Sequence, residues 1–95
     1  MDNDLEFLID FFAQQGRGEP WRKRVLTRYC TAPTLADWRF LAGMRLDGPN
    51  GKSAVLRIAV NEVTGKSLPE APDCYTELPK PEEIAAALTW MFMGG

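Results

Sequence analysis

The sequence predicts an all-α fold, a compact bundle of four to five short helices with a proline-rich connector over residues 66–80. Apolar residues recur at helical spacing in four separate segments. Residues that commonly cap or begin helices stand at the starts of these segments. Ninety-five residues provide for one modest core, so residues 1–95 are expected to form a single small helical domain.

The first helix is expected over residues 4–15. Asn3 can cap this helix, and Glu6 three positions later completes a capping-box pattern. Gly16 follows at the position where glycine commonly ends a helix. The wide apolar surface of this helix favours a place in the core. Its apolar residues are Leu5, Leu8, Ile9, Phe12 and Ala13, with Phe7 and Phe11 beside them.

Two further helices are expected over residues 20–31 and 34–46, joined by a short turn. Pro20 suits the first position of the former helix. Thr34 can cap the latter helix, with Asp37 at the capping-box position. The predicted buried sides are Trp21, Val25, Leu26, Tyr29 and Cys30 in one helix, and Leu35, Trp38, Leu41, Ala42 and Leu46 in the other, where Phe40 and Met44 lie toward the flank.

Residues 53–64 fit two patterns. Polar residues recur at helical spacing from Ser53 to Thr64, and Gly65 would then end a helix. Alternate residues from Ala54 onward are apolar, which is typical of a strand. The prediction is a helix, and the alternative is an α+β fold with a hairpin near residues 54–68.

A last helix is expected to begin at Pro81, with Ile84, Ala87, Leu88 and Met91 in the core. Trp90 and Met93 point away from that stripe. Because aromatic residues and methionine are enriched in protein interfaces, these two residues are candidate anchors for a partner.

The charge distribution is uneven along the chain, although the net charge is only −2. Residues 17–57 carry nine basic and three acidic residues, whereas the segments on either side are acidic. The acidic pI near 5.0 argues against a general nucleic-acid binder. The basic centre either pairs with the acidic flanks or presents one cationic face to an anionic partner.

No set of residues typical of an enzyme is recognisable. The chain contains no histidine, which excludes Ser-His-Asp and Cys-His nucleophilic systems and imidazole metal ligands within it. Cys30 and Cys74 lie far apart without a CxxC pair. We therefore expect a protein that is not an enzyme and that has no catalytic residues, no metal site and no cofactor.

The two cysteines and the N-terminal residues bear on location. The acidic start of the sequence does not resemble a signal peptide, and no apolar run approaches the length of a membrane span. Cys30 and Cys74 are therefore interpreted as reduced, buried thiols of a cytoplasmic protein that does not enter a membrane.

The leading functional hypothesis is a small non-catalytic protein–protein binding module, such as an adaptor, inhibitor or regulator. Accessory proteins of bacteria and their phages are often of this kind. The basic face of the helix over residues 20–31 would contact an acidic partner surface, and exposed apolar residues would anchor it. The predicted partner-binding residues are Arg22, Lys23, Arg24, Arg28, Trp90 and Met93.

Two alternatives remain open at the sequence level. The apolar residues could instead form a homodimer, leaving the basic face for function. Nucleic-acid binding is the rival class, because the helices over 20–31 and 34–46 resemble a helix-turn-helix in outline. Asp37 in the second helix and the acidic pI make nucleic acid the less favoured partner.

Overall fold

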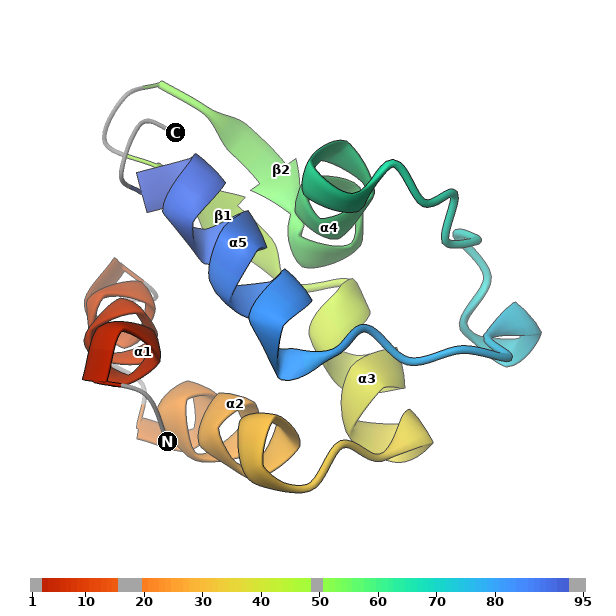
Figure 1. Cartoon of the computed structure of the whole chain (residues 1–95), viewed down its shortest axis with the longest axis horizontal. Helices are drawn as coiled ribbons and strands as arrows, with labels where there is room; N and C mark the ends of the chain where they lie inside the picture. The colour runs from red at the N-terminus through yellow and green to blue at the C-terminus, as the bar shows by residue number, and fades with distance from the viewer. Residues whose placement is uncertain (1–2, 16–19, 49–50, 93–95) are drawn as a thin grey trace.

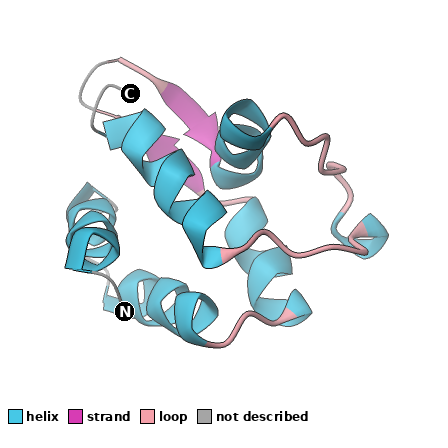
Figure 2. Cartoon of the chain, viewed as in Figure 1, coloured by secondary structure: helices cyan, strands magenta, loops and turns pink. Residues whose placement is uncertain are grey.

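The computed structural model of the chain describes residues 3–15, 20–48 and 51–92. These residues form five α-helices and one small antiparallel hairpin (Figures 1 and 2). The predicted helical bundle is confirmed, with the hairpin as an addition to it. The elements are α1 (Asn3–Gln15), α2 (Pro20–Thr31), α3 (Leu35–Ala42), β1 (Arg45–Asp47), β2 (Ser53–Val55), α4 (Leu56–Thr64), a 3-10 turn η1 (Pro72–Cys74) and α5 (Pro81–Phe92).

Helix α5 is the central element of the bundle, and it packs against α1, α2 and α4 (Figure 1). Its sequence is apolar on most of its circumference, which suits a helix surrounded by others. The predicted stripe Ile84, Ala87, Leu88 and Met91 is fully buried. Helices α1, α2 and α4 are therefore arranged around this apolar helix.

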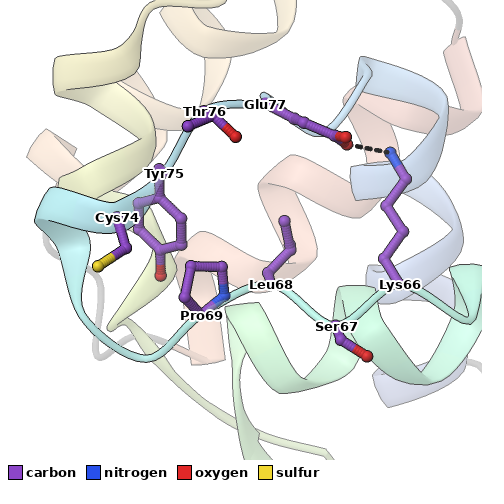
Figure 3. Close-up of a pocket in the computed structure, with 8 residues that line it drawn as sticks. All are labelled: Lys66, Ser67, Leu68, Pro69, Cys74, Tyr75, Thr76 and Glu77. Atoms are coloured by element: carbon purple, nitrogen blue, oxygen red, sulfur yellow. Dashed lines mark ion pairs between the residues drawn. The ribbon is translucent and has the colours of Figure 1, made fainter.

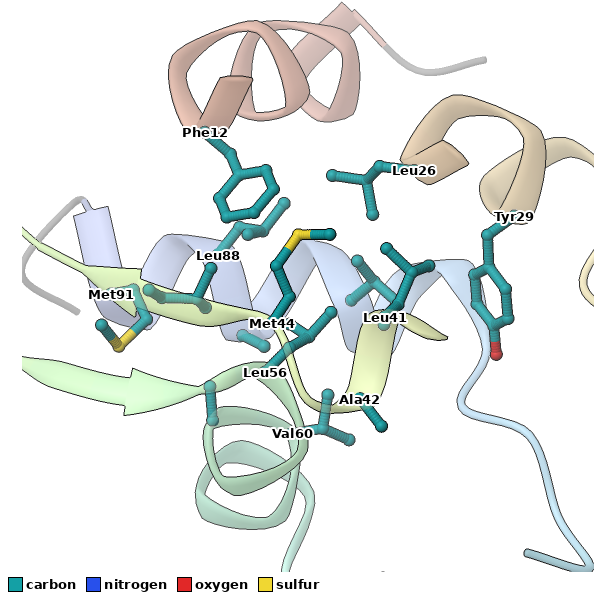
Figure 4. Packing of buried hydrophobic residues seen from close by; sticks show 14 of the residues in the cluster. Phe12, Leu26, Tyr29, Leu41, Ala42, Met44, Leu56, Val60, Leu88 and Met91 are labelled. Atoms are coloured by element: carbon teal, nitrogen blue, oxygen red, sulfur yellow. The ribbon is translucent and has the colours of Figure 1, made fainter. Parts of the chain in front are cut away.

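The core is contiguous and draws side chains from all five helices (Figure 4). Phe12 of α1 and Trp38 of α3 are 2% and 0% exposed. Tyr29 of α2 is also buried, and its hydroxyl donates a 2.6 Å hydrogen bond to the carbonyl oxygen of Pro79. The three helices are thereby fixed relative to one another and to the connector.

The predictions for residues 43–55 are wrong in detail. The third helix ends at Ala42 and does not reach Leu46. At this end the backbone N–H of Gly43 donates to the carbonyl oxygen of Leu41. Residues 45–47 instead pair with 53–55 in an antiparallel hairpin. Leu46 is buried in either arrangement, since the alternating exposure of β1 also turns it toward the core.

The hairpin lies upstream of the position that the α+β alternative gave it. Residues 56–64 form helix α4, which ends at Gly65 with φ +73°, in the left-handed region that glycine adopts readily. Next to the hairpin strands, the N–H of Gly48 donates to the carbonyl oxygen of Lys52 at 2.8 Å. Residues 53–64 thus fit both a strand pattern and a helix pattern because β2 and α4 follow one another there.

The proline-rich connector lies over the surface between α4 and α5 (Figure 1). The side-chain oxygen of Asn61 accepts a 2.9 Å hydrogen bond from the N–H of Leu68. Leu68 and Tyr75 are buried and Leu78 is half-buried. The connector is therefore held against the bundle along its length.

Candidate functional site

The basic residues of α2 divide between two sides of the helix. Lys23 forms an ion pair with Asp10 of α1, and both side chains are about half exposed. The hydrogen bond from Lys23 to Asp10 and their opposite charges raise the pKa of the Lys23 ammonium. Lys23 therefore faces α1, and part of its charge is neutralised within the fold.

Arg28 makes the most specific polar contact of the helix. Its Nε and Nη2 atoms donate to the two carboxylate oxygens of Asp37 in α3 at 3.0 and 2.5 Å. Such a forked contact fixes the geometry of both side chains. The hydrogen bond from Arg28 lowers the pKa of the Asp37 carboxyl. The Asp37 side chain is 10% exposed and that of Arg28 is 62% exposed, so the arginine still reaches solvent.

Asp37 also explains the start of α3. The Thr34 hydroxyl accepts a 3.2 Å hydrogen bond from the backbone N–H of Asp37, which confirms the predicted cap. The Asp37 carboxylate pairs with Arg28, which joins the cap to the preceding helix. These two contacts thus stabilise the turn between α2 and α3.

An aromatic pair lies beside this ion pair. The rings of Trp21 and Phe40 meet edge to face, with centroids 5.2 Å apart. Phe40 is 49% exposed and Trp21 is half-buried. The guanidinium of Arg22 lies 5.3 Å from the centroid of the Trp21 ring, a cation–π distance. Two large rings and a guanidinium therefore share one surface.

Arg24 completes this surface. It is exposed, and it makes no hydrogen bond or ion pair to any residue within the described ranges. It stands three residues after Trp21 and four before Arg28, which places all three on one side of α2. We call this region the α2–α3 surface, defined by Trp21, Arg22, Arg24, Arg28 and Phe40.

The remaining predicted partner-binding residues lie elsewhere. Trp90 is half-buried in α5, and the Lys52 ammonium lies 4.5 Å from its ring centroid and donates to its carbonyl oxygen at 3.0 Å. Trp90 is therefore covered in part by the hairpin and is less exposed than expected. Met93 lies outside the described residues. Arg24 and Arg28 lie on one side of α2, and Arg22 lies over the Trp21 ring, whereas Trp90 belongs to α5.

Phe40 is the surface residue that the sequence interpretation passed over. Its position off the stripe of buried residues in α3 was visible as a large aromatic residue on the flank of a helix. The partner on that flank, Trp21, belongs to another helix and was assigned to the core. The pair became apparent only with the crossing of the two helices.

A pocket of about 250 Å³ lies under the connector (Figure 3). Lys66 at its edge is held by Glu83 at 3.1 Å and Glu77 at 3.9 Å, so its charge is balanced within the fold. Cys74 and Tyr75 also line this pocket. Among its lining residues, no nucleophile has an adjacent base.

The two cysteines differ in environment. Cys30 is half-buried, and burial raises the pKa of its thiol to about 11. Cys74 is exposed, so the expectation that both cysteines are buried is wrong for Cys74. Its place in η1 on the outside of the connector accounts for the exposure. Within the described ranges, no three side chains of the metal-ligating types His, Cys, Asp and Glu lie close enough to share an ion.

None of the helices in the described part of the chain combines the length and the apolar character of a membrane span. No protein-family model, curated protein or solved structure matches the sequence or the fold.

Proposed function

We propose that this protein is a small, non-catalytic binding module that docks on an acidic surface of another protein through the α2–α3 surface. The observation that carries the proposal is the half-exposed Phe40 ring, packed on Trp21 at the crossing of α2 and α3, where the guanidinium of Arg22 lies over the Trp21 ring and Arg28 of α2 pairs with Asp37 of α3. Aromatic residues and arginine are the types most enriched at the energetic centres of protein interfaces.

The rigidity of the surface supports the proposal. Trp21 and Phe40 are held by the helix crossing, and Arg28 is held by Asp37. Side chains fixed before binding lose less conformational entropy when a partner arrives. The surface therefore offers a partly preorganised contact area.

Charge supports an acidic partner. The surface carries the guanidinium groups of Arg24 and Arg28 against the carboxylate of Asp37, so these described residues have a positive excess. A guanidinium can donate two parallel hydrogen bonds to a carboxylate, which gives both affinity and orientation. In this proposal Phe40 supplies the apolar contact, and Arg24 and Arg28 bind partner carboxylates.

The experiment compares the wild-type chain with the double variant Arg24→Glu/Phe40→Ala in affinity capture from the native host, with nuclease present throughout. We expect one protein to be retained by the wild type and lost by the double variant. Loss of an interface aromatic typically costs about 2 kcal/mol or more, a decrease in affinity of about thirtyfold. Binding constants of the captured protein, measured by calorimetry with both chains, would give the size of the loss.

Two single variants serve as matched controls. Arg45→Glu reverses another exposed arginine, in the hairpin, and Trp90→Ala removes the aromatic anchor predicted on α5. Both are expected to retain the captured protein. Retention by the Arg24→Glu/Phe40→Ala variant would contradict the proposed surface. Capture that disappears with nuclease would instead favour the nucleic-acid class, which binds through phosphates.

A cytoplasmic location forms part of the same proposal. Free thiols at Cys30 and Cys74 fit a reducing compartment.

A further inference from the structure

A second pocket, also of about 250 Å³, lies where α3, the start of α4 and the connector meet. It adjoins the pocket of Figure 3, since Tyr75 lines both. The lining residues that matter for its chemistry are Arg39, Gly43, Val55, Arg57, Glu70 and Tyr75.

Two arginines from different helices line this pocket. Arg57 of α4 is half-buried, and its Nη1 donates to the carbonyl oxygen of Leu68 at 3.3 Å. That contact anchors the guanidinium while its other N–H groups meet no acceptor among the residues of the described ranges. Arg39 of α3 is exposed and contributes a second guanidinium to the lining. Two guanidiniums in one concave site attract an anion.

Tyr75 provides the independent observation. It is only 5% exposed, and its ring packs on Trp38 with centroids 5.9 Å apart. Its hydroxyl makes no hydrogen bond to a described residue, and it is not among the buried side-chain atoms that lack a partner, which are Arg22 Nε and Trp38 Nε1. The ring is therefore buried while the hydroxyl oxygen reaches solvent and can bind a ligand. Burial raises the pKa of Tyr75, and the charge of Arg57, which lines the same pocket, opposes part of that rise. At neutral pH the hydroxyl keeps its proton and can donate it.

We propose that this pocket binds a small oxyanion, the phosphate or carboxylate group of a small molecule, between Arg39, Arg57 and the Tyr75 hydroxyl. Glu70 also lines the pocket, so it would accept a hydrogen bond from a protonated oxygen of the ligand. A singly protonated phosphate has the complementary set of one donor and several acceptors. The proposal does not depend on the function proposed for the α2–α3 surface.

The test is a titration of the isotopically labelled full chain with sodium phosphate at pH 6.5, followed by NMR. Sodium chloride at matched ionic strength is the reference. We expect saturable shifts of the amide signals of Gly43, Val55 and Arg57 with phosphate and not with chloride. A parallel titration with acetate distinguishes a phosphate site from a general carboxylate site, and saturable binding of either supports the proposal.

Three variants localise the binding. Arg57→Gln is expected to weaken it by about tenfold, the effect of losing one charge-assisted hydrogen bond. Tyr75→Phe keeps the buried ring and removes only the hydroxyl, so a smaller loss with an unchanged fold is expected. Arg24→Gln, which changes an exposed arginine outside the pocket, is expected to leave the phosphate affinity unchanged.

Two outcomes would overturn the proposal. One is equal shifts with phosphate, acetate and chloride, which would indicate charge screening alone. The other is wild-type phosphate affinity in both Arg57→Gln and Tyr75→Phe. Arg24→Glu/Phe40→Ala should still bind phosphate, so failure of the protein-binding surface and failure of the pocket are separable results.

Discussion

Two neighbouring residues of α3 face different kinds of surface. Phe40 stands on the α2–α3 surface against Trp21, whereas Arg39 lines the pocket shared with Arg57 and Tyr75. The first region presents a half-exposed and a half-buried ring and one arginine held by Asp37, which suits the proposed contact with another protein. The second places two arginines in the lining of a small concave pocket, which suits the proposed small anion. In these proposals the surroundings of an arginine, more than its charge, decide what it binds.

Trp38 packs against Tyr29 of α2 and against Tyr75 of the pocket, so its replacement is expected to have the largest effect on stability. The Trp38 ring is fully buried and contacts Tyr29 on one side and Tyr75 on the other, with centroids 6.1 and 5.9 Å away. Replacing a buried aromatic with alanine typically costs about 3–5 kcal/mol in the free energy of unfolding. We expect Trp38→Ala to lose about that much in urea denaturation and to weaken both binding sites together.

Two variants sharpen this prediction. Phe40→Ala, on the same helix, should change the free energy of unfolding by less than about 1 kcal/mol, because its ring is half exposed. Trp38→Phe should cost much less than Trp38→Ala, since it removes an indole N–H that has no hydrogen-bond partner in the described structure. Equal losses of stability for Phe40→Ala and Trp38→Ala would contradict the buried position of Trp38 and the half-exposed position of Phe40.

The glycines that end α3 and α4 give the next largest effect. Gly65 adopts φ +73° at the start of the connector, whereas Gly43 has φ −87°. A side chain in the left-handed region costs about 1–2 kcal/mol, so Gly65→Ala should lower the free energy of unfolding by roughly this amount. Gly43→Ala should be nearly neutral, because its Cβ would meet no atom within 4 Å. Equal effects in thermal unfolding would contradict the assigned backbone conformation.

The Arg28–Asp37 pair predicts a pH dependence confined to the α2–α3 surface. Because the hydrogen bond from Arg28 lowers the pKa of Asp37 in the folded state, the unfolded chain binds a proton at higher pH than the folded chain does. The contribution of Asp37 to stability is therefore complete above the ordinary carboxyl pKa of about 3.9 and is lost as the pH falls through the lower folded value.

The variant Asp37→Asn tests this linkage. Thermal unfolding of the wild type should lose stability on acidification below about pH 4, and Asp37→Asn should lose less over the same interval. Asp47→Asn removes an exposed carboxylate of the hairpin and is the matched control. An unchanged acid dependence in Asp37→Asn would show that the ion pair does not contribute in solution.

Local patterns predicted the elements whose causes are local. The helical stripes of α1, α2 and α5, the Thr34 cap and the Gly65 terminus all depend on residues within a few positions of one another. The hairpin was missed because Leu46 satisfies a helix stripe and a strand alternation equally well, and Gly43 alone signalled the break. Pairing between β1 and β2 depends on register across a loop, which periodicity does not encode.

The candidate site was predictable only in part for the same reason. A helical projection placed Arg24 and Arg28 on one face of α2, since that relation lies within one helix. The projection did not reveal that Lys23 forms an ion pair with Asp10, that Arg28 forms one with Asp37, or that Phe40 packs against Trp21. Each of those contacts joins two helices, and their crossing is set by the packing of the whole core.

Lys23 and Arg24 offer the finest comparison, because they are adjacent residues of like charge that point in different directions from α2. Lys23 pairs with Asp10 of α1, and Arg24 belongs to the α2–α3 surface. If that surface binds the partner, Arg24→Gln should weaken binding measured by calorimetry, and its salt dependence should decrease. Lys23→Gln should leave the affinity unchanged, since it removes an exposed ion pair directed toward α1. Equal weakening by the two variants would mean that the partner wraps around α2, and the interface would then include the α1 side as well.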